Sequence, residues 1–111
     1  MNEMGSVLRR ARFLMNRLPM ARVRVDRARG DGFVDTAKGA YGALREELEA
    51  LRDVIRPAIE TLEDPLDREV MEMRYLQGLS VREIAYRINY SEQHVFRVAQ
   101  RAAGKLESRE S

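Results

Sequence analysis

The sequence predicts an all-α protein, with a helical N-terminal region at residues 1–62 and a module of three shorter helices at residues 64–107. Charged residues make up 34% of the 111-residue chain, aromatic residues only 6%, and tryptophan is absent. This composition is typical of a solvated helical protein and not of a sheet sandwich. Apolar residues recur at three- and four-residue steps along most of the chain. The C-terminal half is also rich in residues that begin and end helices.

The composition excludes several classes of protein. Cysteine is absent and His94 is the one histidine, so disulfides, thiolate chemistry and a histidine metal site are excluded. No apolar run approaches the roughly 18 residues of a membrane span, and no secretory signal is recognisable. Paired carboxylates, a nucleophile–histidine set and a phosphate loop are all missing. We therefore expect a cytoplasmic protein that is not an enzyme and that needs no cofactor or metal.

The net charge of +2 is unevenly distributed. Residues 1–31 hold eight arginines and three acids, residues 32–64 hold four basic residues and eight acids, and residues 65–111 hold eight basic residues and seven acids. A polyanion is a candidate partner for the basic N-terminal segment, although a solvated helix face is the simpler interpretation. As an arm, residues 9–29 could reach a minor groove.

Residues 3–18 are predicted to form the first helix, which Pro19 ends because proline lacks an N–H donor. Residues 20–33 are expected to be irregular, with a short extended piece at residues 22–25 and a glycine turn at residues 30–32. The apolar positions of this helix are Val7, Leu8, Ala11, Leu14, Met15 and Leu18.

Residues 34–62 carry an apolar seam with unbroken 3-4 spacing over four heptads, which is typical of supercoiled helices. Glu47 and Arg52 flank it, where they could form interhelical ion pairs. Pro57 is expected to kink or interrupt the helix near residues 53–56. The seam consists of Val34, Ala37, Tyr41, Leu44, Leu48, Leu51, Ile55, Ala58 and Leu62.

The seam needs a partner helix, and the sequence offers two. One is the helix at residues 3–18 of the same chain, and the other is the same seam of a second chain. The sequence does not choose between a helix hairpin and a coiled-coil dimer, and we favour the homodimer.

The module is predicted to begin with a helix over residues 64–78. Asp64 is a suitable N-cap, Pro65 fits the first helical position, and Asp67 lies at the positive end of the helix dipole. Gly78 is the expected C-terminal cap. One face of this helix carries Leu66, Val70, Met73 and Leu76.

Two further helices, at residues 80–88 and 91–106, are joined by a tight turn. Ser80 and Glu83 form a capping-box sequence, and Asn89 is suited to the left-handed conformation that the turn requires. The second helix begins with a serine cap of its own. These features form the helix-turn-helix pattern, in which a small residue, here Ala85, lets two steeply crossing helices approach. The predicted core of the motif is Ile84, Ala85, Ile88, Asn89, Val95 and Val98.

In this motif the N-terminal half of the second helix enters the major groove of double-stranded DNA. Gln93 could read adenine, and Arg97 could read guanine or hold a phosphate. Arg101 and Lys105 are better placed for the DNA backbone, and Arg82 could anchor a flanking phosphate. We expect Glu92 to cap its helix and Phe96 to pack against the module's first helix. The candidate DNA contacts are Ser80, Arg82, Ser91, Gln93, His94, Arg97, Gln100, Arg101 and Lys105.

Residues 64–106 resemble region four of bacterial sigma factors, which recognises the upstream promoter element. The residues that carry the resemblance are Arg68, Glu69, Val70, Arg74, Tyr75, Gly78, Leu79, Ser80, Glu83, Ile84, Ala85, Ser91, Val95, Arg101, Ala102 and Leu106. Tyr90-Ser91 at the turn is also similar to small phage late-gene activators of the ArpU/RinA type. Asn89 stands where sigma factors prefer glycine and His94 where many have threonine, which bears on the DNA sequence and not on the fold.

The resemblance implies a DNA-binding transcriptional regulator of phage or prophage origin, which could touch RNA polymerase. As a symmetric dimer it would meet two half-sites about 34 Å apart. Two alternatives stay open. One is a DNA-packaging recognition subunit, similar to a small terminase, and the other is a module that binds polymerase or an anti-sigma partner instead of DNA.

Overall fold

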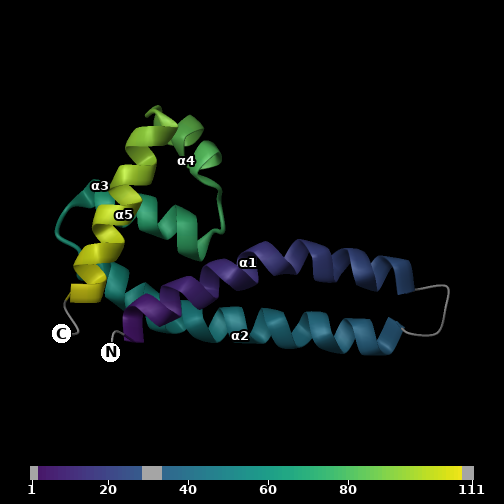
Figure 1. Ribbon diagram of the computed structural model, residues 1–111. Coiled ribbons are helices and arrows are strands. Elements are labelled where there is room, and N and C mark those ends of the chain that lie inside the picture. Colours follow the sequence, from purple (N-terminus) through teal and green to yellow (C-terminus); the bar gives the residue numbers. More distant parts are fainter. Residues whose placement is uncertain (1–2, 29–33, 109–111) are drawn as a thin grey trace.

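The computed structural model describes residues 3–28 and 34–108, in which the regular secondary structure is entirely helical and no strand occurs. The predicted fold class is therefore confirmed. In Figure 1 the first two helices form a long antiparallel hairpin, and the remaining helices gather over one end of it, near both chain termini. The turn expected at residues 30–32 lies outside the described residues. The elements are α1 (Glu3–Ala28), α2 (Val34–Glu60), α3 (Pro65–Met71), the π-helix η1 (Glu72–Leu76), α4 (Val81–Ile88) and α5 (Glu92–Ser108).

The apolar seam of α2 packs against α1 of the same chain. Leu8 and Leu14 of α1 share a buried cluster with Leu48 and Ile55 of α2. Across the hairpin, the Arg10 guanidinium forms two hydrogen bonds with Glu47, of 2.6 and 2.8 Å, which hold the pKa of Glu47 below its usual value. The hairpin, one of the two arrangements open from the sequence, thus covers this seam without a second chain.

The predicted end of the first helix at Pro19 is wrong, because α1 continues through Pro19 to Ala28. The extended piece expected at residues 22–25 is helical as well. Proline removes one backbone hydrogen bond, but Pro19 lies on the exposed side of α1. Beyond it, Ala21 and Val25 keep the four-residue spacing and are partly buried, so the extra turns retain an apolar stripe.

Pro57 does not interrupt α2, contrary to one of the two effects expected of it. Ile55 and Ile59, which flank it, are both fully buried. Packing on both sides of the proline therefore holds the last turn of the helix in place. α2 ends at Glu60, and Leu62 is buried just beyond it.

The hairpin and the module share one apolar core. Met71 and Tyr75 from α3 and η1, and Ala102 and Leu106 from α5, belong to the same buried cluster as the facing residues of α1 and α2. We call this cluster the shared core. Arg52 of α2 adds a polar tie, since it donates a 2.8 Å hydrogen bond to the Tyr75 carbonyl. The module therefore packs directly against one end of the hairpin.

A second, smaller cluster lies inside the module and is named the motif core here. It joins α3, α4 and α5 without any residue of the hairpin. Its buried members are Val70, Ile84, Ala85, Val95, Val98 and Ala99.

Candidate nucleic-acid interface

The first helix of the module begins and ends as predicted, but its second half is a π-helix. The Asp64 side chain accepts a 2.9 Å hydrogen bond from the Leu66 N–H, and Pro65 occupies the first position. The helix then widens into η1, and its last turn is closed by a bond from the Leu79 N–H to the Met73 carbonyl. Gly78, with φ of 73°, terminates it as predicted. No sequence signal pointed to the π-helical turn.

The start of α4 is fixed by a complete capping box. The Glu83 N–H donates to Ser80 Oγ and the Ser80 N–H donates to Glu83 Oε1, each at 3.1 Å. The backbone bond from Ser80, and then the bond to its side chain, lower the pKa of Glu83. This predicted cap is confirmed.

The turn between α4 and α5 is confirmed as well. Asn89 has φ of 61° and ψ of 42° in the left-handed region, and the Tyr90 N–H bonds to the Ala85 carbonyl at 3.1 Å. Ser91 Oγ then accepts a 3.1 Å bond from the His94 N–H, which caps α5. Ala85 is 5% exposed and belongs to the motif core, so the small residue lies where the two helices approach each other.

The N-terminal half of α5 presents its polar side chains to solvent. Gln93, His94, Arg97 and Gln100 are all exposed. Within the described residues, the side chains of Gln93 and Arg97 make no hydrogen bond or ion pair. His94 lies against the Tyr90 ring, with centroids 4.9 Å apart. Exposed donors without an internal partner on the first turns of α5 are what major-groove reading requires.

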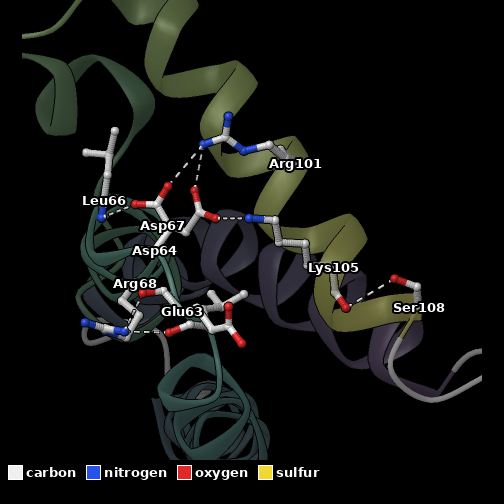
Figure 2. A network of polar contacts seen from close by, with 9 residues as sticks. Glu63, Asp64, Leu66, Asp67, Arg68, Arg101, Lys105 and Ser108 are labelled. Carbon is white, nitrogen blue, oxygen red and sulfur yellow. Dashed lines mark hydrogen bonds and ion pairs between the residues drawn. The ribbon is translucent and has the colours of Figure 1, made fainter.

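Arg101 and Lys105, further along α5, have a partner inside the protein (Figure 2). Arg101 Nη2 lies 2.9 Å from Asp67 Oδ1, and Lys105 Nζ lies 2.7 Å from Asp67 Oδ2. Asp67 is completely buried. Burial opposes ionisation of this carboxyl, but the hydrogen bonds from Lys105 and Arg101 outweigh it and hold the pKa of Asp67 below its usual value.

The sequence placed Asp67 only in the field of the helix dipole and missed this ion-pair cluster. A signal was present, because Asp67 precedes Val70 and Met71 by three and four residues. That spacing places its side chain on the same face as two buried apolar residues. A carboxylate on a buried face needs cationic partners. The predicted backbone contacts of Arg101 and Lys105 stay a prediction.

Arg68 fixes the loop that joins hairpin and module. Its Nη1 donates to the Leu62 carbonyl at 2.6 Å. It also donates to the Glu63 carbonyl at 3.2 Å, and Figure 2 shows Arg68 beside Glu63. These bonds satisfy carbonyls just beyond the C-terminal end of α2, where helices leave acceptors unpaired.

Phe96 is 45% exposed. It lines a small cavity of about 80 Å³ together with Arg12 and Tyr75. The packing that we expected for Phe96 is thus only partial, and it involves α1 as well as the module.

No helix within residues 3–28 and 34–108 is long and apolar enough to cross a membrane, and these residues contain no group of acids and histidine that could hold a metal. No curated protein and no solved structure matches the chain. Residues 58–107, from the last turn of α2 to the end of α5, match the family Sigma-70, region 4. The C-terminal part of this protein is therefore similar to sigma region 4, a family of DNA-binding helix-turn-helix domains.

Proposed function

We propose that the protein regulates transcription by binding specific sequences of double-stranded DNA, with the N-terminal half of α5 in the major groove. One observation carries this proposal. The start of α5 is capped by Ser91 and packed through Val95, and it presents Gln93 and Arg97 to solvent with no partner among the described residues. The match of residues 58–107 to a DNA-binding family supports the same function.

The proposed contacts divide into base reading and backbone binding. Gln93 would pair with adenine and Arg97 with guanine, since each side chain suits a two-point contact with that base. Ser80 and Arg82, at the start of α4, would hold a flanking phosphate. Arg101 remains 53% exposed despite its bond to Asp67, which leaves donors for the DNA backbone.

The resemblance to phage late-gene activators is the basis for proposing a transcriptional regulator of phage or prophage origin. A homodimer would place two copies of α5 in successive major grooves, about 34 Å apart. Because α1 covers the α2 seam, the dimer would need another surface. Among the described residues of the hairpin, the exposed large apolar side chains are Phe13, Met20, Val23 and Val54. Contact with RNA polymerase would then couple bound DNA to initiation.

The first test is selection from a random DNA pool with the full-length protein at near-physiological salt. We expect one enriched motif, and two copies at fixed spacing if the protein is a dimer. A pool that stays random would contradict sequence reading and favour a module that binds polymerase or an anti-sigma partner. A ring-sized mass in solution together with an enriched motif would favour a DNA-packaging subunit.

The second test uses Arg97→Ala on the selected duplex. We expect loss of about 1–3 kcal/mol of specific binding, with a smaller loss on unrelated DNA, because a base contact disappears. Arg45→Ala is the matched control, since Arg45 is exposed on an α2 face that also carries Glu46, Glu49 and Asp53. Equal losses on both duplexes would reduce Arg97 to a phosphate contact.

A further inference from the structure

A cavity lies between α1 and the start of α4, outside the base-reading face of α5. It has a volume of about 370 Å³. Arg12 and Asn16 line it from α1, and Arg74 lines it from η1. The loop and first turn of α4, including Ser80, complete the wall. The hairpin therefore contributes a basic side chain next to the helix-turn-helix.

The cavity is lined by two arginines, Arg12 and Arg74. Arg12 is exposed, whereas Arg74 is only partly so. Burial, and then the positive charge of Arg12, lower the pKa of Arg74 from its usual value. Holding two guanidinium groups together with partial loss of water is unfavourable unless an anion lies between them.

The protein itself does not supply that anion among its described residues. Neither Arg12 nor Arg74 forms an ion pair with a carboxylate there. Glu83 also lines the cavity and keeps its negative charge, but its carboxylate accepts the Ser80 N–H of the capping box and forms no ion pair with either arginine. The lining thus carries two positive charges and one negative charge, and within the described residues neither arginine is paired with a carboxylate.

The location of the arginine pair indicates which anion would fill the site. Arg12 and Arg74 also line the small cavity beside Phe96 and Gln100 of α5. The pair therefore lies between the start of α4 and the outward face of α5, the two parts of a helix-turn-helix that approach DNA. Guanidinium groups are well suited to phosphate oxygens.

We propose that Arg12 of α1 and Arg74 of η1 form a phosphate-binding site that takes a backbone phosphate of the bound DNA. This inference rests on the proposed function, and it makes α1 part of the DNA-binding surface. A free phosphorylated molecule has the same recognition chemistry, so the test separates the two sources.

The test compares Arg12→Gln with Arg45→Gln in the full-length protein. We expect Arg12→Gln to weaken DNA binding about tenfold on specific and unrelated duplexes alike. We also expect the slope of log affinity against log salt to be shallower by about 0.9, because one counter-ion fewer is released. Arg45→Gln should change neither quantity. Equal effects of the two variants would overturn the proposal.

A stability measurement separates this role from a structural one. Removing one of two repelling charges should leave the thermal midpoint of Arg12→Gln unchanged or higher while affinity falls. A lower midpoint that fully accounts for the lost binding would overturn the assignment.

Wild-type protein that fails to bind DNA at low salt would remove the proposed function but not decide the phosphate site. Inorganic phosphate is then titrated while the guanidinium NMR signals of Arg12 and Arg74 are followed. Saturable shifts in the wild type that are lost in Arg12→Gln would support a site for a free phosphate. Absence of shifts would overturn the site itself.

Discussion

The hairpin and the helix-turn-helix are stabilised by different means. The hairpin depends on a long apolar stripe, with side chains such as Leu14 and Ile55 fully buried between α1 and α2. The module depends on local devices as well, among them the capping box at Ser80 and the left-handed turn at Asn89. The hairpin thus contributes most of the facing side chains of the shared core, whereas the local caps and the turn of the module fix where α5 begins.

The largest loss of stability is expected from a substitution in the shared core. Ile55→Ala should lower the free energy of unfolding by about 2–5 kcal/mol, because it leaves a cavity at a fully buried site. Tyr75 and Leu106 of the module belong to the same cluster, so hairpin and module should unfold together. Urea denaturation followed by circular dichroism measures both.

Ile55→Val is the conservative control, with an expected loss of about 0.5–1.5 kcal/mol. Two separate transitions in Ile55→Ala, with the module's transition unmoved, would show that the module does not depend on the hairpin.

The next effect concerns Asp67, which ties α3 to α5. Asp67→Asn should cost about 2 kcal/mol at pH 7, since two bonds to charged groups are weakened. The folded-state pKa of Asp67 is lowered, so its contribution is present above the usual pKa of about 3.9 and is lost as pH falls through the folded value.

Unfolding free energies of wild type and Asp67→Asn, measured from pH 7 to pH 3, test this account. Their difference should be constant down to about pH 5 and shrink below about pH 4. Glu47 and Glu83 also have lowered pKa values, but both proteins retain them. A difference that does not change with pH would contradict ionic stabilisation.

The smallest expected change in stability concerns the left-handed turn at Asn89. Asn89→Leu should destabilise the protein by about 1–2 kcal/mol, because a branched side chain is unfavourable at φ of 61°. Asn89→Gly should be neutral or slightly stabilising. Thermal denaturation of both variants measures these changes in stability. Equal losses of stability in the two variants would mean that the asparagine side chain, and not its backbone conformation, stabilises the turn.

The sequence predicted the module more accurately than the hairpin, for a physical reason. Ser80, Asn89 and Ser91 act on the backbone within a few residues of themselves, so the two caps and the turn could be predicted locally and are confirmed. The end of α1 depends on packing against α2, which outweighs the effect of Pro19. The residues around Pro19 do not reveal that this packing outweighs the lost hydrogen bond.

In the candidate site, too, local features could be predicted from the sequence, whereas contacts between distant residues could not. The positions of Gln93 and Arg97 on α5 followed from helical spacing and are found exposed as expected. The ion pair of Asp67 with Lys105 and the cavity shared by Arg12 and Arg74 bring together residues far apart in the chain. Only the folded arrangement brings those side chains together.

Backbone amide chemical shifts, recorded while the selected duplex is added, test directly whether α5 reads DNA. DNA reading by α5 predicts the largest changes at residues 91–101, with further changes at residues 80–82 and at Arg12. Changes confined to the outer face of α2 around Arg45, or no changes at all, would contradict it.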